Sequence, residues 1–145
     1  MLITRATEYA IRAVLYLAKQ PAGEVVLKKD ICRTQDITPA FLTKIFQPLI
    51  KCGIVGSQRG VGGGFYLARD PEVVSLLDIV EAQEGKILFN YCMEKPGTCK
   101  RDKLCPVHDA WGNVRGQVTA ALQDVTFDEL VRNEENKLKA VGSGH

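Results

Sequence analysis

The sequence predicts a mainly α-helical chain with one small β-hairpin, in which three helices precede the hairpin and further helices follow it. Two observations predict this class. Apolar residues recur at three- and four-residue steps through most of the chain, which is the period of a helix with one buried face. A glycine-rich run separates two short strand-like segments, which marks the hairpin. With 145 residues, 46% hydrophobic and 25% charged, the composition is that of a folded domain.

The first helix is predicted from Thr4 to Lys19, because Thr4 can act as its N-cap and one face is apolar. That face consists of Ala6, Tyr9, Ala10, Ala13, Val14, Leu17 and Ala18. Residues Val25 to Leu27 are expected to form a short strand. Residues Lys28 to Gln35 have room for two turns of a second helix.

A third helix is predicted to start directly after Thr38, which is a good N-cap followed by Pro39 at the first helical position. Its apolar face consists of Phe41, Leu42, Ile45, Leu49 and Ile50. Gly53 is expected to end the helix. Pro48 lacks a backbone N–H, so we expect it to kink or shorten the last turns.

Two strand-like segments follow, Ile54 to Ser57 and Phe65 to Leu67, and the tip between them carries Arg59 and four glycines. Three helices followed by such a hairpin are typical of a winged helix-turn-helix. In that fold the third helix enters the major groove of DNA and the hairpin, or wing, reaches the neighbouring minor groove.

The second half of the chain is predicted to be helical around one irregular loop. Ser75 opens a helix that Gly85 closes, and residues 90–106 then lose any periodicity. A long helix is expected from His108 to Leu122, and a last one from Phe127 to about Leu138. The loop contains three of the five cysteines, so we expect a bound group to hold it in place.

The charges divide the chain into two parts. Residues 1–69 carry ten Lys and Arg against four Asp and Glu, whereas the rest carries nine bases against thirteen acids. A basic first half can bind the phosphates of DNA, whereas an acidic second half cannot and is expected to serve sensing or subunit pairing. We therefore expect a DNA-binding domain at 1–70 and a second unit at 71–141, with 142–145 resembling the remnant of a purification tag.

The cysteines indicate metal or redox chemistry. No apolar run approaches the roughly 20 residues of a membrane span, and no secretory signal opens the chain, so we expect a cytoplasmic protein without membrane contact. An odd number of cysteines in the cytoplasm argues against a disulfide framework. Cys32 and Cys52 fall on predicted helices and are expected to act as small hydrophobic residues.

Cys92, Cys99 and Cys105 share the irregular loop, and His108 follows closely. Thiolates bind zinc, copper(I) or iron–sulfur clusters, and imidazole can complete either shell. The gaps between the cysteines are longer than the two to four residues usual in structural zinc sites, which favours a cluster over zinc. Three unrelated thiols on a surface loop are the remaining alternative.

The residues expected to contact DNA lie on the third helix and the wing. They are Thr38, Pro39, Ala40, Phe41, Thr43, Lys44, Gln47, Arg59, Gly60 and Gly62. Thr, Lys and Gln can hydrogen-bond to bases or phosphates, and an arginine on a glycine-rich tip suits a narrow minor groove. Alternatively, Arg59 is a solvated loop residue. No nucleophile–base pair appears, so we do not expect an enzyme.

Three motifs resemble the Rrf-two family of bacterial regulators from Met1 to about Val131. These are Thr7-Glu8-Tyr9-Ala10, Phe41-Leu42 before Leu49, and the wing from Arg59 through the glycines to Ala68. The three cysteines and the run from Cys105 through His108 to Trp111 most resemble the members that hold an iron–sulfur cluster, in which three cysteines and a histidine bind a 2Fe–2S cluster.

The resemblance implies a cluster-dependent repressor or dual regulator that senses redox state, iron or nitric oxide. The cluster would be 2Fe–2S, with 4Fe–4S as the alternative, and Glu8 from the partner subunit competes with His108 as the fourth ligand. It also implies a homodimer paired through the helix that begins at His108. Two recognition helices would then meet successive major grooves of a palindromic operator in double-stranded DNA. Residues 71–141 would supply the cluster-binding loop and the dimerisation helices.

Two other functions remain open from the sequence. One is a protein-interaction regulator of the same fold that docks a metabolic enzyme. The other is a DNA-binding regulator that uses zinc or thiol chemistry without a cluster.

Overall fold

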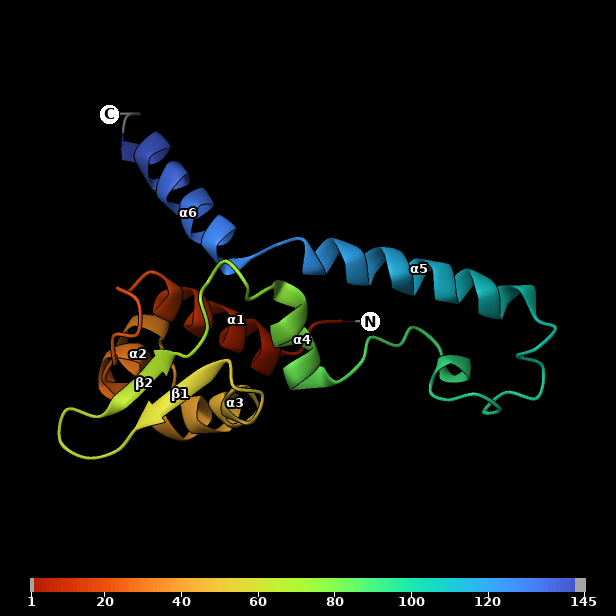
Figure 1. Cartoon of the computed structure of the whole chain (residues 1–145), viewed down its shortest axis with the longest axis horizontal. Coiled ribbons are helices and arrows are strands. Elements are labelled where there is room, and N and C mark those ends of the chain that lie inside the picture. Colours follow the sequence, from red (N-terminus) through yellow and green to blue (C-terminus); the bar gives the residue numbers. More distant parts are fainter. Residues whose placement is uncertain (1, 143–145) are drawn as a thin grey trace.

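The computed structural model describes residues 2–142, which form six α-helices, one two-stranded sheet and a short 3-10 helix (Figure 1). The elements in chain order are α1 Arg5–Ala18, α2 Lys28–Gln35, α3 Pro39–Lys51, β1 Val55–Gln58, β2 Gly64–Leu67, α4 Leu76–Glu84, η1 Tyr91–Met93, α5 Pro106–Gln123 and α6 Phe127–Gly142. The mainly helical winged-helix class is therefore confirmed. Within the described part of the chain, no helix is both long and apolar enough to cross a membrane.

Local sequence signals set the boundaries of the first three helices. The hydroxyl groups of Thr4 and Thr38 accept hydrogen bonds from the backbone N–H groups of Thr7 and Phe41, so each caps its helix as expected. Helix α3 runs through Pro48 to Lys51, and the expectation that Pro48 shortens the helix is wrong. Proline removes only one hydrogen bond near the end of a helix whose buried face continues to Leu49.

The wing is an antiparallel pair in which Val55 lies opposite Leu67 and Gln58 lies opposite Gly64. The prediction of a strand at residues 25–27 is wrong, because this segment forms only one isolated β-bridge in the described chain. Val26 exchanges two backbone hydrogen bonds with Phe65, of 2.7 and 2.9 Å. Helix α2 begins at residue 28, which leaves no room for a longer pairing.

One hydrophobic core joins α1, α3, the wing and the elements that follow it. Its fully buried side chains include Val14 of α1, Phe46 of α3, Ile79 of α4 and Phe127 at the start of α6. Buried apolar side chains of this size stabilise a fold by about 1.5–3 kcal/mol each. The core therefore holds α3 and the wing in a fixed relation, which a DNA-binding surface requires.

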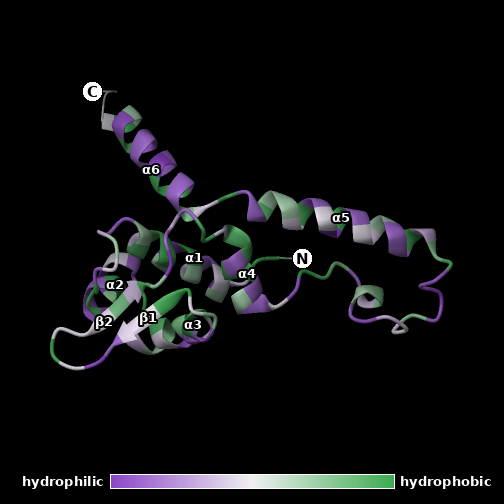
Figure 2. Ribbon diagram, viewed as in Figure 1, coloured by the Kyte–Doolittle hydropathy of each residue, from purple (hydrophilic) through white to green (hydrophobic). Residues whose placement is uncertain are grey.

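Helices α5 and α6 extend away from this body (Figure 1). Helix α5 begins at Pro106, two residues earlier than expected, and α6 continues to Gly142 rather than ending near Leu138. Figure 2 shows hydrophobic residues along α5, although in the described chain this helix has no buried residue. Of the expected tag remnant, Gly142 is the last residue of α6 and 143–145 lie outside the described residues.

Candidate DNA-binding surface and cysteine loop

The recognition helix α3 presents a polar face to solvent because its apolar residues Leu42, Ile45, Phe46 and Leu49 are buried in the core. On the opposite face, Thr38, Pro39, Ala40, Lys44 and Gln47 are exposed and Thr43 is half-buried. The helical period places these residues together, as the sequence predicted.

Phe41 has a different role from its neighbours. Its ring packs edge-on against Tyr9 of α1, with 5.6 Å between the ring centroids, and it is half-buried. The guanidinium of Arg12 lies 5.0 Å from the same Tyr9 ring. The aromatic pair fixes the start of α3 against α1, so Phe41 supports the recognition helix as well as lying beside its exposed face.

Sequence reasoning missed Lys28, at the first position of α2. Its Nζ donates a 2.6 Å hydrogen bond to the hydroxyl of Thr43 on α3. The sequence does contain a signal for Lys28, because a lysine is unusual at a helix N-terminus, where the helix dipole disfavours positive charge. The Thr43 hydroxyl donates in turn to the backbone carbonyl of Pro39, at 3.1 Å.

The tip of the wing is a glycine turn that exposes Arg59. Gly60 and Gly62 adopt φ angles of 95° and 77°, a left-handed region that favours glycine, and the N–H of Gly63 donates to the carbonyl of Gly60 at 3.0 Å. Arg59 and the fully exposed Val61 stand at this tip. An arginine carried on a narrow, projecting loop can enter a minor groove.

Three cations of α2, α3 and the wing form no ion pair with an acidic residue in the described chain. Among residues 2–142 the ion pairs are Lys19–Glu134, Arg33–Asp30 and Arg132–Asp128. None of them includes Lys28, Lys44 or Arg59, whose charges therefore remain available to phosphate.

The cysteine loop has a hollow of about 510 Å³ between residues 92–103 and the first turns of α5. Cys92 and His108 both line it, whereas Cys99 and Cys105 do not, although all three thiols are half-buried. In the described part of the chain, no three Cys, His, Asp or Glu side chains are close enough to hold a metal ion. The structure thus brings two of the four predicted ligands to one hollow.

The surroundings of this hollow suit a thiolate-bound group. The Nδ1 atom of His108 is buried and has no hydrogen-bond partner, which is costly unless something binds it. Lys95, Lys103 and Arg115 line the same hollow and can offset the negative charge of thiolate ligands. The donor chemistry and the unpartnered imidazole nitrogen therefore fit an iron–sulfur cluster or a zinc ion.

Short-range bonds hold the loop itself. Its backbone hydrogen bonds span three residues, as in Thr98 to Lys95 and Asp102 to Cys99, both 3.2 Å. The Asp102 carboxylate accepts from the N–H of Gly97 at 2.8 Å. Phe89 stacks on Trp111 of α5 with 6.0 Å between centroids, which attaches one end of the loop. A segment built this way can rearrange at low cost.

Glu8, the alternative fourth ligand, is exposed on α1 and is not among the residues that line the hollow. Within one chain it therefore does not join the cysteine loop.

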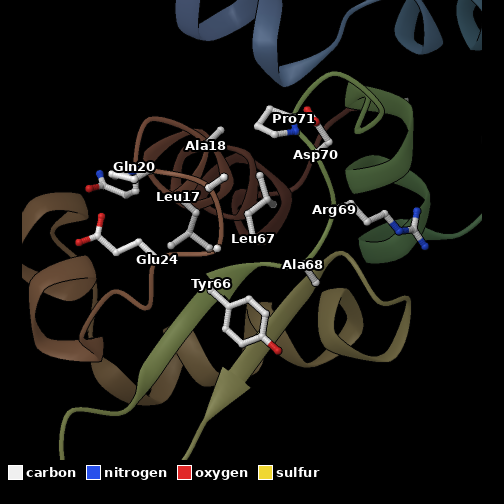
Figure 3. A pocket seen from close by; sticks show the side chains of 13 residues that line it. Leu17, Ala18, Gln20, Glu24, Tyr66, Leu67, Ala68, Arg69, Asp70 and Pro71 are labelled. Carbon is white, nitrogen blue, oxygen red and sulfur yellow. The ribbon is translucent and has the colours of Figure 1, made fainter.

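A second hollow, of about 450 Å³, lies between the end of α1, the turn before α2 and the segment after β2 (Figure 3). Leu17, Ala18 and Leu67 contribute apolar surface, and Gln20 and Glu24 contribute polar surface. It contains none of the residues predicted to bind DNA or metal.

The fold and the exposed basic surface define a winged helix-turn-helix protein of the DNA-binding class. A model of the Rrf2 family, described as an iron-dependent transcriptional regulator, matches residues 3–133, and the chain belongs to this family. Its relatives are transcriptional regulators rather than enzymes.

Individual relatives agree with this assignment. The HTH-type transcriptional regulator IscR of Escherichia coli O1:K1/APEC is 31% identical over 135 residues, which cover 93% of this chain and 83% of the relative. The structure of T. potens IscR superimposes with a TM-score of 0.74 at 23% identity, covering 94% of this chain and 90% of that one. CymR (YrzC), the global cysteine regulator of B. subtilis, gives a TM-score of 0.72 at 25% identity, covering 92% and 98%.

Proposed function

We propose that this protein is an operator-binding repressor or dual regulator whose activity is set by an iron–sulfur cluster on the loop from residue 90 to His108. The observation that carries the proposal is the hollow that both Cys92 and His108 line, together with the buried Nδ1 of His108, which has no hydrogen-bond partner. The family description as iron-dependent and the resemblance to cluster-binding members support it.

Cys92, Cys99, Cys105 and His108 would hold the cluster, 2Fe–2S or 4Fe–4S. When bound, it supplies a redox-active, iron-dependent centre. Binding requires Cys99 and Cys105 to move toward the hollow, and the short-range bonds of the loop permit this. Because Cys105 is the N-cap of α5, a loop closed on a cluster would also fix the start of that helix. The state of the loop would thereby bias the orientation of the winged domains.

The DNA contacts would come from residues 1–70. The exposed face of α3 would enter the major groove with Thr38, Pro39, Ala40, Phe41, Thr43, Lys44 and Gln47, and the wing would reach the minor groove with Arg59, Gly60 and Gly62. The exposure of these residues and the unneutralised cations support this assignment. Two such surfaces in a homodimer would read a palindromic operator.

The exposed area of the single chain supports a homodimer. A compact monomer of 16.0 kDa is expected to expose about 7,400 Å², whereas this chain exposes 9502 Å². The excess of roughly 2,000 Å² is in the range that each subunit of an obligate dimer buries. On α5, Val107 and Val114 are exposed and Trp111 is half-exposed on one helical face, which would pair with the partner subunit.

The first experiment is anaerobic purification followed by an absorbance spectrum and iron, sulfide and zinc analysis. We expect a red-brown protein with charge-transfer bands and matched iron and sulfide. Cys92→Ser, Cys99→Ser and Cys105→Ser should each lose the bands, whereas the matched controls Cys32→Ser and Cys52→Ser should keep them. A protein that stays colourless after reconstitution would contradict the cluster and favour a zinc- or thiol-based regulator.

The fourth ligand is tested by two further variants. Since Nδ1 of His108 is buried without a partner, His108→Ala should shift the charge-transfer bands and shorten the lifetime of the cluster in air. Glu8→Gln should leave the bands in place. If Glu8 from the partner subunit is the ligand instead, Glu8→Gln should shift the bands and His108→Ala should leave them in place. That result is expected only from the dimeric protein.

A further inference from the structure

The hydrogen bond between Lys28 and Thr43 joins α2 to the centre of the DNA-facing side of α3. The Nζ of Lys28 lies 2.6 Å from the Thr43 hydroxyl. Thr43 is one helical turn from both Ala40 and Gln47, which are exposed on the same face. A lysine of the neighbouring helix therefore places its charge in the middle of the recognition surface.

The local structure of α2 does not explain this lysine. Lys28 and Lys29 occupy the first two positions of the helix, where the positive end of the helix dipole favours acidic residues. In the described chain Lys28 takes part in no ion pair. Residues that break a local rule without a local compensation are expected at functional sites.

The hydrogen bonds define what the pair can recognise. The Thr43 hydroxyl gives its only hydrogen to the carbonyl of Pro39 at 3.1 Å and accepts from Lys28. The ammonium group of Lys28 has three N–H donors, so two remain. In the major groove, guanine presents two acceptors, O6 and N7, and lysine is one of the side chains that bind them.

We propose that Lys28 is a specificity-determining residue that reads a guanine in the major groove and that Thr43 is the residue that positions it. This inference rests on the proposed operator-binding function. It assigns base reading to the first helix of the helix-turn-helix, through a side chain that α3 holds in place. Lys29, exposed and next in sequence, serves as the matched control for the removal of one lysine charge from the same helix end.

The test uses full-length protein and the operator that the wild type selects from a random duplex library. Affinities of the wild type, K28M and K29M are measured at fixed salt for this operator, for single base-pair variants and for random DNA. K28M should lose about 10- to 100-fold at the operator and clearly less on random DNA, where the variant removes only one charge. For K28M, the loss of affinity caused by replacing one particular G·C pair of the operator should disappear. K29M should weaken operator and random DNA by the same factor.

Variants at Thr43 test the positioning role. T43V removes the hydroxyl with little change of shape, so discrimination at the same G·C pair should fall by a larger factor than binding to random DNA does. T43S keeps the hydroxyl and should discriminate at that pair more strongly than T43V. Thermal unfolding checks that each variant is folded, which is expected because Lys28 and Thr43 are outside the core.

Three results would overturn the inference. K28M could weaken operator and random DNA equally with a shallower salt dependence, which identifies a phosphate contact. K28M could also keep the base preferences of the wild type. Finally, a wild type that selects no sequence would refute the proposed operator binding and this inference together, whereas the first two results leave operator binding intact.

Discussion

Arg59 and Glu84 are the two residues at which a single side chain has the clearest consequence. Arg59 has no ion-pair partner in the described chain and stands on a turn whose glycines keep bulky side chains away. Glu84, at the end of α4, instead binds the start of α1. Its Oε1 accepts from the N–H of Thr4 at 2.7 Å and from the hydroxyl of Thr7 at 2.9 Å. Arg59 is thus exposed and unpaired at the tip of the wing, whereas Glu84 joins two helices.

Arg59→Ala should weaken operator binding by about 1–3 kcal/mol, because it would remove the guanidinium from the proposed minor-groove contact. The measurement is a fluorescence anisotropy titration at fixed salt. Lys137→Ala, an exposed cation on α6, is the matched control and should bind as the wild type does. Equal affinities for Arg59→Ala and Lys137→Ala would remove Arg59 from the interface.

Glu84 makes the stability of the fold depend on pH. Its partial burial by itself raises the pKa of the carboxyl, but hydrogen bonds from the backbone of Thr4 and the hydroxyls of Thr7 and Thr4 outweigh burial and lower the pKa. A carboxyl whose folded pKa is lowered stabilises the protein above its unfolded pKa. That stability is lost as the pH falls below the ordinary range of a glutamate.

Glu84→Gln should therefore lower the free energy of unfolding at neutral pH, by about 0.5–1 kcal/mol for a partly exposed charged hydrogen bond. The difference from the wild type should shrink as the pH falls below the ordinary glutamate range. Urea unfolding from pH 3 to 7 measures both. Glu81→Gln, exposed on the same helix and without a side-chain hydrogen bond to α1 in the described chain, is the matched control for removing one carboxylate from α4. A difference that is constant with pH would contradict the ionic role of Glu84.

At the scale of elements, the wing depends on a close approach between two backbones. A Cβ placed on Gly64 would collide with the carbonyl of Val26 and lie 3.0 Å from Cα of Leu27. The same contact carries the bridge between Val26 and Phe65. The glycine therefore lets the wing pack against the chain that enters α2, and so sets the position of Arg59 relative to α3.

Gly64→Ala should destabilise the protein by about 1–3 kcal/mol, since backbone atoms cannot move aside as side chains do. It should also weaken operator binding, because the wing shifts relative to α3. Thermal unfolding and the same anisotropy titration measure the two effects. Val61→Ala, at the fully exposed tip, is the control for stability and should unfold as the wild type does. An unchanged midpoint for Gly64→Ala would show that the bridge is dispensable.

At the scale of the whole molecule, the main feature is a body with a complete core and a long helix without one. Helix α5 contacts the body in its second half, where Val118 and Leu122 pack against a small cluster that includes Leu77 and Val80. Its first half, with Trp111 and Val114, extends beside the cysteine loop (Figure 1). Pairing and sensing would therefore be coupled through the same helix.

Val114→Glu should convert the dimer to a monomer, because it places a charge in the proposed apolar interface. Light scattering after size-exclusion chromatography measures the mass. Ala120→Glu, exposed on α5 about a third of a turn around the helix from Val114, adds the same charge outside the proposed face and should leave the dimer intact. The monomeric variant should also lose affinity for a palindromic operator, since two linked recognition helices bind more tightly than one. A dimeric Val114→Glu protein would contradict pairing through this face.

The sequence by itself determined the helices, the wing and their order. Thr4, Thr38 and Ser75 carry their capping signals within three or four residues, and the apolar period identifies the buried face of α3 without any tertiary information. The length of the expected strand near Val26 was wrong because pairing to Phe65 is a long-range contact. The missed continuation through Pro48 has the same origin, since core packing outweighs one lost hydrogen bond.

The candidate sites divide in the same way. Residue type and spacing identified the exposed side chains of α3, Arg59 and the three cysteines. Only the tertiary structure decided that Cys92 shares a hollow with His108 while Cys99 and Cys105 do not, and that Lys28 meets Thr43 fifteen residues away. The periodicity of a helix depends on residues near one another in the sequence, so it can be recognised without tertiary information. A binding site depends on how separate elements pack together, and the burial of their common core determines that packing.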